Sequence, residues 1–232
     1  MRLRLALFFL LLAAPALAKK APPPPPPVEI ALEWKTGTVL YQTTPTAQLE
    51  RVTGTQIVKR DSFVTTGPSS LGILVYPDKS HVVLGEGTTV QVGAFEARGS
   101  RASSFIRIPP TGGVVRFDIN HQSNGESDYV FATSLARITV RGTSAMLSDG
   151  IGGDTITCLV CEAGDVVARL GARDFALLTG DTMHISPRGH VTIDKTREAV
   201  LAAFAAAGLS TQVPPTPTPQ PRRRFHLPKI KL

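Results

Sequence analysis

The sequence has few of the residues that usually carry chemistry. Only two cysteines, one tryptophan and three tyrosines stand among the 232 residues. The five histidines are His81, His121, His184, His190 and His226. None of them stands at an H-x-x-x-H or H-E-x-x-H metal spacing, and there is neither a G-x-S-x-G elbow nor a phosphate-binding glycine loop. We therefore expect a protein that is not an enzyme, with no catalytic residue, no cofactor and no metal ligand.

Long hydrophobic runs are also lacking, apart from one near the N-terminus. Leu5–Ala14 is an apolar stretch of about ten residues, which fits a signal peptide but falls short of the roughly 20 residues of a membrane span. Arg2 and Arg4 precede it, and Ala16–Ala18 supplies the small residues of a cleavage site. The pattern predicts a signal peptide at 1–18, a mature chain that begins at Lys19 and has no transmembrane span, and a periplasmic or secreted location.

The positive net charge of +7 belongs to the ends of the chain. Of the 25 Lys and Arg residues, nine lie in the first twenty or the last eleven residues, which leaves 16 against 18 Asp and Glu between them. A body so close to neutral has no electrostatic surface for a phosphate backbone. We expect no nucleic-acid partner.

Proline is concentrated in two segments that flank the body. Six consecutive prolines end at Pro27, and Val213–Pro221 reads V-P-P-T-P-T-P-Q-P. Proline fixes φ and donates no hydrogen bond, so both segments are expected to be stiff polyproline II spacers. The predicted organisation is a linker at 19–27, a β domain at 28–195, a capping helix at 196–208 and a proline-rich basic tail at 209–232.

The body itself has the pattern of strands and turns. Val115, Phe117 and Ile119 alternate with Arg116 and Asp118, which is the period-two pattern of a half-buried strand. Similar apolar or β-branched runs, separated by turn residues, are Thr38–Gln42, Leu71–Tyr76, His81–Leu84, Thr88–Val92, Ser104–Ile108, Tyr129–Ala132, Arg137–Val140, Thr155–Val160, Val166–Leu170, Phe175–Leu178 and His190–Ile193. One helix is expected, with Thr196 capping Arg197–Ala207 and Gly208 ending it. The fold class is all-β, with many short strands in a sandwich, barrel or solenoid-like body and one C-terminal helix.

Two groups of residues are candidates for chemistry or contact. Cys158 and Cys161 form a C-L-V-C in an exported protein, but residues three apart in an extended strand lie about 10 Å apart, beyond the reach of a disulfide. The spacing favours two unpaired cysteines, with a bulged or strained bridge as the alternative and redox catalysis as a third. The basic residues of the tail, which either contact an anionic envelope surface or form a free basic end, are Arg222, Arg223, Arg224, Lys229 and Lys231.

Two loops have a polar composition without a complete site. Asp149–Asp154 contains two carboxylates among glycines, but it lacks the six to eight oxygen ligands, roughly, that calcium takes. It is therefore interpreted as a glycine-rich hairpin tip. Asn120–Asp128 is expected to be a solvated loop, although its polar side chains are also of a kind that faces a ligand. Arg141–Thr143 is interpreted as a backbone turn after a strand.

The order of these segments resembles that of the FecR domain. The matching segments are Trp34–Val39, Asp61–Gly67, Val75–Ser80, Val83–Val90, Gly112–Phe117, Phe131–Thr143, Val160–Val166 and Leu178–Asp181. The resemblance covers roughly Glu33 to Asp194 and implies an all-β extracytoplasmic domain without catalytic residues. FecR regulators also carry an anti-sigma segment and a transmembrane helix, and in this sequence a leader and a proline-rich segment stand in their place.

The resemblance therefore implies a non-catalytic binding or scaffolding module of the bacterial cell envelope. Its partner is expected to be an envelope protein or an anionic envelope surface. One alternative is a periplasmic signalling adaptor that works through a separate membrane partner. The other is an envelope enzyme with an unrecognised site.

Overall fold

The computed structural model describes residues 29–98, 101–110, 112–120 and 127–212, and these residues form two nine-stranded sheets and one helix. The first sheet contains, in spatial order, β18 (Val191–Lys195), β17 (Asp181–Ile185), β14 (Gly153–Val160), β13 (Ser144–Gly150), β10 (Gly113–Asp118), β7 (His81–Leu84), β6 (Leu71–Val75), β1 (Ile30–Thr36) and β4 (Thr55–Val58). The second contains β16 (Arg173–Leu177), β15 (Val166–Leu170), β12 (Arg137–Val140), β11 (Asp128–Ala132), β9 (Arg101–Arg107), β8 (Thr89–Arg98), β5 (Ser62–Thr66), β2 (Val39–Gln42) and β3 (Glu50–Val52).

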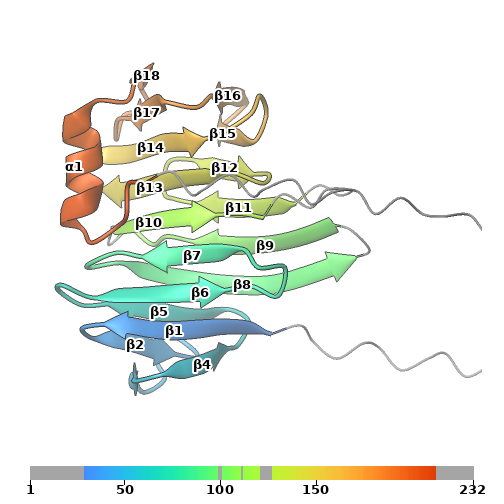
Figure 1. Cartoon of the computed structure of the whole chain (residues 1–232), viewed down its shortest axis with the longest axis vertical. Coiled ribbons are helices and arrows are strands. Elements are labelled where there is room, and N and C mark those ends of the chain that lie inside the picture. The colour runs from blue at the N-terminus through green and yellow to red at the C-terminus, as the bar shows by residue number, and fades with distance from the viewer. Residues whose placement is uncertain (1–28, 99–100, 111, 121–126, 213–232) are drawn as a thin grey trace, which may run out of the picture.

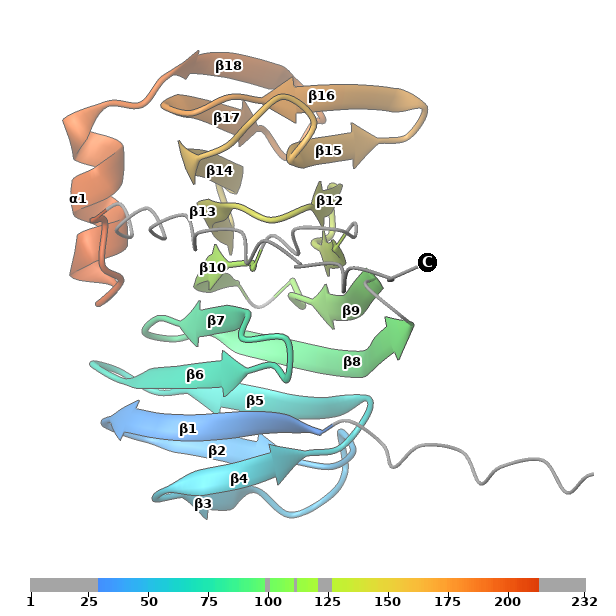
Figure 2. The same ribbon diagram turned by 45° about the vertical axis from the view of Figure 1, so that its right-hand side comes forward.

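The chain builds both sheets together by crossing from one to the other after each hairpin. Hairpin β6–β7 lies in the first sheet, β8–β9 in the second, β13–β14 in the first and β15–β16 in the second. The result is a tall stack of strand layers, with the N-terminal strands at one end and β16 to β18 at the other (Figures 1 and 2). Between β9 and β11 the chain adds only one strand, β10, to the first sheet. Strand β11 then lies in the second sheet and runs parallel to β9.

The hydrophobic core lies between the two sheets. Alternate residues of each strand point inward, as Val115 and Phe117 do in β10. Phe117 stacks on Phe131 of the facing sheet, with ring centroids 4.4 Å apart. Because period-two alternation buries one face of each strand, two such faces pressed together remove their apolar side chains from water.

The prediction of an all-β body with one C-terminal helix is confirmed. Of the architectures left open, the described residues form a two-sheet stack and not a closed barrel, because each sheet has two terminal strands, each paired on one side only. The turn at Pro77–Ser80 is confirmed by the hydrogen bonds from the Tyr76 amide to the Ser80 carbonyl oxygen and from the Lys79 amide to the Tyr76 carbonyl oxygen, and by the positive φ of Lys79. The turn predicted at Ser123–Gly125 lies outside the described residues.

Helix α1 (Glu198–Ala206) begins one residue later than predicted. Arg197 occupies the N-cap position without a side-chain hydrogen bond, so the prediction that Thr196 caps the helix was wrong. The hydroxyl of Thr196 instead lies 2.9 Å from the Thr182 hydroxyl on β17. The predicted end is confirmed, because Gly208 follows with a φ of +83°.

Helix α1 covers part of the outer face of the first sheet, as Figure 1 shows. Phe204 and, after the helix, Leu209 form a second apolar cluster with Met146 and Leu159, separate from the main core. The helix therefore lies beside the stack, not over its end. No helix in the described part of the chain has the length and apolar character needed to cross a bilayer.

Candidate functional site

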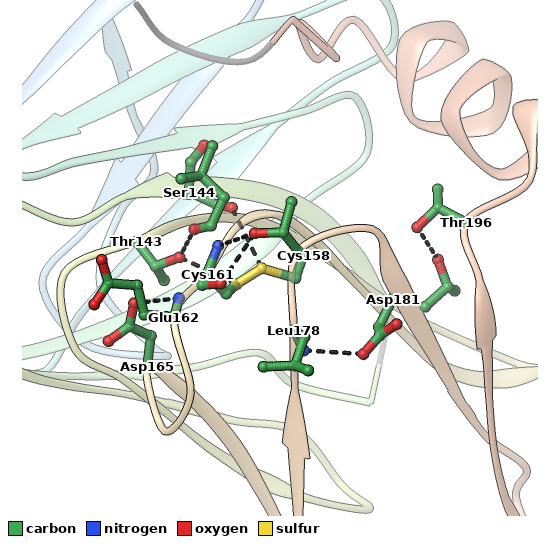
Figure 3. Close-up of a disulfide and its surroundings, with 12 residues drawn as sticks. Thr143, Ser144, Cys158, Cys161, Glu162, Asp165, Leu178, Asp181 and Thr196 are labelled. Carbon is green, nitrogen blue, oxygen red and sulfur yellow. Dashed lines mark hydrogen bonds between the residues drawn. A yellow bond between two sulfur atoms is a disulfide. The ribbon is translucent and has the colours of Figure 1, made fainter. Parts of the chain in front are cut away.

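The structure joins Cys158 and Cys161 by a disulfide at the end of β14 (Figure 3). Their Cα atoms lie 6.1 Å apart. In the β13–β14 ladder Ala145 pairs with Cys158 and Ser144 with Val160, so Leu159 is an extra residue and forms a bulge. A separation of about 10 Å holds only for a continuous strand. That premise was wrong, and with it the argument for two unpaired cysteines.

Two threonines hold the chain around the disulfide. Thr143 donates a hydrogen bond to the carbonyl oxygen of Val160 and lies 3.1 Å from the Cys161 sulfur. Thr179 accepts a hydrogen bond from the Cys161 amide at 2.8 Å and donates one to its carbonyl oxygen at 2.9 Å. Thr143 is placed by the backbone turn predicted at Arg141–Thr143, which is confirmed by the φ of +78° at Gly142.

We expect the exported protein, unfolded in denaturant, to contain no free thiol. The bridge closes a very short loop, so the double variant Cys158→Ser/Cys161→Ser is expected to lose only about 2 kcal/mol of unfolding free energy in the chain-entropy model. Thiol titration in denaturant measures the first expectation, and urea unfolding measures the second. The same titration after reduction is the control and must release both thiols. A thiol that reacts before reduction contradicts the disulfide.

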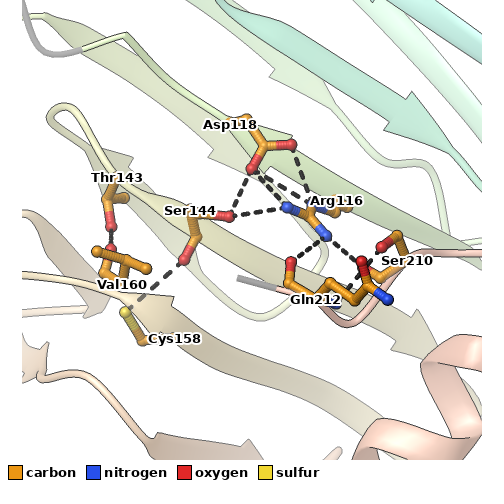
Figure 4. A network of polar contacts seen from close by, with 8 residues as sticks. All are labelled: Arg116, Asp118, Thr143, Ser144, Cys158, Val160, Ser210 and Gln212. Atoms are coloured by element: carbon orange, nitrogen blue, oxygen red, sulfur yellow. Dashed lines mark hydrogen bonds and ion pairs between the residues drawn. The ribbon is translucent and has the colours of Figure 1, made fainter. Parts of the chain in front are cut away.

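A second polar cluster surrounds Arg116 on the outer face of the first sheet (Figure 4). The guanidinium is almost fully buried and forms an ion pair with Asp118 at 3.0 Å. Its Nη1 also donates to the carbonyl oxygens of Ser210 and Gln212, at 2.5 and 2.9 Å. Ser144, next to the disulfide-bearing strand, donates to Asp118. We call this the Arg116 clasp: it holds residues 210–212, the last residues that the structure describes, against β10.

The sequence analysis did not identify the Arg116 clasp. The visible signal was an arginine and an aspartate two residues apart in an otherwise apolar strand, which placed both on the same face. Which segment would cover that face depends on the path of the chain after α1, and no local pattern in the sequence encodes that path.

Two buried carboxyl groups meet across the β13–β14 hairpin. Asp149 and Asp154 are directly paired in the ladder and point inward, with side chains that are 5% and 1% exposed. Asp154 accepts a hydrogen bond from the Thr133 hydroxyl at 2.5 Å. One oxygen of each carboxyl group, Asp149 Oδ2 and Asp154 Oδ1, has no hydrogen-bond partner.

Burial is the main cause of the raised pKa of both groups. The pKa of Asp154 is raised to about 7, mainly by burial and also by the neighbouring Asp149, against the lowering effect of the Thr133 hydrogen bond. Burial also raises the pKa of Asp149, and the neighbouring Asp154 carboxyl group opposes this rise. A proton between the two carboxyl groups would give each otherwise unpaired oxygen a partner. The prediction of a hairpin tip here is confirmed, with Ile151 and Gly152 between the two strands.

A fourth feature is a cavity of about 290 Å³ between α1 and the first sheet. It is lined by Val114, Ser148, Thr155, His184, Ala199, Val200, Ala203 and Phe204. A cleft of about 380 Å³ shares Ser148, Thr155 and His184 with it and reaches His190. His184 and His190 thus line the same cleft, and Thr155 Oγ1 lies 3.0 Å from His184 Nδ1. Within the described ranges no group of three or more His, Cys, Asp or Glu residues has the arrangement of a metal site.

The remaining candidates are scattered or fall outside the described residues. His81 lies on β7, is exposed, and lines neither the cavity nor the cleft. Asp128, at the end of the polar loop, forms ion pairs with Arg101 and with Arg141, the latter at 3.1 Å. The rest of that loop from 121 to 126, including His121, is not described. The tail residues outside the described part are Arg222, Arg223, Arg224, His226, Lys229 and Lys231.

Comparison with known proteins identifies the fold but no family. No family model and no curated protein sequence matches the chain. A crystal structure titled as a "putative anti-sigma factor" from Parabacteroides distasonis is similar, with a TM-score of 0.50 and 13% sequence identity. The match covers 62% of this chain and 63% of that one, so this chain spans less than two thirds of the length of its structural neighbour. A second crystal structure with the same description gives a TM-score of 0.49, 13% identity and coverages of 62% and 64%.

Proposed function

We propose that the chain is an exported, non-catalytic, FecR-like binding or scaffolding module of the bacterial cell envelope. The observation that carries the proposal is the Arg116 clasp, because it holds residues 210–212, which directly precede the proline-rich segment in the sequence, against the two-sheet body. A module that holds partners at defined positions needs a flanking segment that is attached to its body at a fixed point. The proline-rich composition on both sides of the body supports the same role, since stiff segments keep neighbours at a distance.

Export is supported by two independent features. The first eighteen residues have the pattern of a signal peptide. The Cys158–Cys161 disulfide belongs in an oxidising compartment such as the periplasm, because the bacterial cytosol keeps thiols reduced. The likeness of the fold to a protein titled as an anti-sigma factor supports a FecR-like body.

The proposal is tested by capture from an envelope extract with a chemical crosslinker. We expect the full exported chain to retain a defined envelope protein that a spacer-only chain, residues 19–28 joined to 212–232, does not retain. The control isolates the body because both chains carry the same proline-rich and basic segments. An identical set of captured proteins for the two chains would contradict a binding role for the body.

The basic tail is proposed to contact an anionic envelope surface. Each Lys or Arg near such a surface contributes about 1 kcal/mol, so the five charges together should strengthen binding to vesicles at least about a hundredfold. Pelleting with vesicles of phosphatidylglycerol and phosphatidylcholine measures this for the full chain and for a chain ending at Thr211. A full-length variant with all five charges replaced by Gln is the matched control. Equal pelleting of the full chain and the Gln variant removes the tail from the proposal.

A second candidate function is a periplasmic signalling adaptor that works through a separate membrane partner. The observation in its favour is the likeness of the fold to a crystal structure described as that of an anti-sigma factor. Deletion of the gene separates the two candidates. An adaptor changes the transcription of an uptake system, whereas a scaffold changes envelope integrity alone.

A further inference from the structure

The two ends of the strand stack differ in how their edges are protected. At one end the outermost strands are β18 and β16, and at the other they are β4 and β3. Each of these strands pairs on one side only within the described residues. An edge strand presents unpaired backbone groups to any other strand that approaches, and charged side chains are a common way to prevent this.

The β16–β18 end carries such charges. Strand β18 contains Asp194 and Lys195, and Lys195 forms an ion pair with Asp181 at 2.6 Å. Strand β16 begins with Arg173 and Asp174, and Asp174 forms an ion pair with Arg169 at 2.6 Å. A strand added at this end would have to cover these charges, so the end is protected against pairing.

At the other end the second-sheet edge, β3, also carries two exposed charged residues, Glu50 and Arg51, but the first-sheet edge, β4, has no such protection. Strand β4 reads Thr55-Gln56-Ile57-Val58 and contains no charged residue, and the Ile57 side chain is 42% exposed. Two further large apolar side chains at this end, Trp34 on β1 and Leu49 just before β3, are also exposed. An uncharged edge strand beside exposed apolar side chains is the composition of a pairing site.

Strand directions indicate how a second copy would fit. Every neighbouring pair in the first sheet is antiparallel, and β4 and β18 are eight positions apart in the strand order, so they run in the same direction. Stacking one copy's β18 end onto another copy's β4 end would therefore create a parallel pair in the first sheet. A two-fold axis at the β4 end instead pairs β4 of one copy with β4 of the other in the antiparallel sense. An antiparallel ladder is slightly more stable than a parallel one.

We propose that this chain forms a closed two-fold dimer in which β4 of one copy pairs antiparallel with β4 of a second copy. The Pro22–Pro27 run close before β1 cannot occupy this edge as a strand, because proline has no N–H to donate to a ladder. The two-fold pairing places Ile57 opposite Ile57 or Thr55 of the second copy, since Thr55 and Ile57 share the outer face. It also keeps the Lys59 residues of the two copies apart, because in an antiparallel pair the C-terminal end of each strand lies beside the N-terminal end of the other.

The edge of the second sheet lies over the same end of the stack. Strand β3 is three residues long and ends next to β4 in the chain, so the two-fold axis brings both copies of β3 toward each other as well. Association stops at two copies, because pairing uses the β4 end of each copy and leaves only the charged β16–β18 ends free.

The test measures mass against concentration by sedimentation equilibrium for the full exported chain, Lys19–Leu232. The wild type is expected to pass from monomer to dimer between about 1 µM and about 1 mM, and to form nothing larger. Ile57→Lys places like charges opposite each other at the axis and is expected to raise the dissociation constant at least about tenfold. Ile193→Lys is the matched control, because Ile193 is 41% exposed on β18 of the same sheet; it should dimerise like the wild type.

Several outcomes overturn the proposal. These are a wild type that stays monomeric throughout, an Ile57→Lys variant that dimerises normally, an Ile193→Lys variant that loses the dimer, and growth beyond two copies. Thermal melting of each variant shows that it is folded. Amide exchange gives a second readout that does not depend on a variant: the amides of Thr55–Val58 should exchange more slowly as the wild-type concentration rises, and unchanged exchange counts against the pairing. The proposed envelope function does not depend on this result.

Discussion

The unfolding free energy of the protein is expected to fall as the pH rises from about 4 to about 7, and then to level off. The cause is the buried pair Asp149 and Asp154, whose inward oxygens have no donor when both groups are ionised. Burial raises the pKa of Asp154 to about 7 in the folded state. In the unfolded chain an aspartate loses its proton near a pKa of about 3.9.

The sign of the effect follows from the protons bound. Between the two pKa values the folded state keeps a proton that the unfolded state has released. Each pH unit within that window therefore favours unfolding, by at most about 1.4 kcal/mol for one proton. Asp128 and Asp181 have a lowered pKa: hydrogen bonds and charges of Arg101 and Arg141 lower that of Asp128 against burial, and the Lys195 hydrogen bond lowers that of Asp181. Their contribution is lost only at more acidic pH, so it does not cancel the slope above pH 4.

Replacing one carboxyl group by an amide isolates the pair. Asp149→Asn is expected to raise the unfolding free energy at pH 8 by about 1–3 kcal/mol, because it removes one buried charge and adds an N–H donor for Asp154. Urea unfolding at pH 5, 6, 7 and 8 measures both the gain in unfolding free energy and the loss of its dependence on pH. Asp174→Asn, at an exposed ion pair, is the control and should leave the slope unchanged. A wild type with no slope, or an Asp149→Asn variant that keeps it, contradicts this reading.

The second large effect is expected at the Arg116 clasp. Arg116→Ala leaves Asp118 and the carbonyl oxygens of Ser210 and Gln212 without their donor. Removing one partner of a fully buried ion pair costs about 3–5 kcal/mol, and because Asp118 is partly exposed we expect about 2–4 kcal/mol here. For a domain of this size the melting temperature should fall by roughly 2–4 °C for each kcal/mol.

A local readout distinguishes the clasp from a general packing loss. Amides at residues 209–212 should lose protection from exchange in Arg116→Ala well below the temperature of global unfolding, because the clasp holds that segment directly. Arg98→Ala is the control, since Arg98 is largely exposed and its pair with Glu96 lies on the surface; it should change neither stability nor exchange. A variant that melts early but keeps these amides protected until it unfolds would show that the clasp does not anchor the segment.

Strand positions were accessible from the sequence where the alternation was clean. His81–Leu84, Arg137–Val140 and Val166–Leu170 were predicted with the bounds that the structure shows. Their alternation places a buried residue at every second position, and turn residues stop the pattern on both sides. The choice of a two-sheet stack among the β architectures was not accessible, because alternation does not specify which strand pairs with which.

The features of the candidate site that the sequence did not reveal all depend on register between distant strands. The single extra residue at Leu159 brings Cys158 and Cys161 close enough to bond, and no local pattern marks that bulge. Asp149 and Asp154 were interpreted as part of a turn, yet the turn is only two residues long and the hairpin pairs the two carboxyl groups inside the stack. Thr196 was assigned to the helix start, but its hydroxyl contacts β17 instead.

The position of the Arg116 clasp has a mechanical consequence. The described chain enters the body at β1 and is held again at β10, and the first sheet connects these two strands through β6 and β7. A pull applied to both ends of the molecule would therefore be carried by the ladders between β1 and β10 while the clasp stays closed. The strands from β13 onward lie outside that path, so they would carry no tension until the hydrogen bonds from Arg116 to Ser210 and Gln212 break.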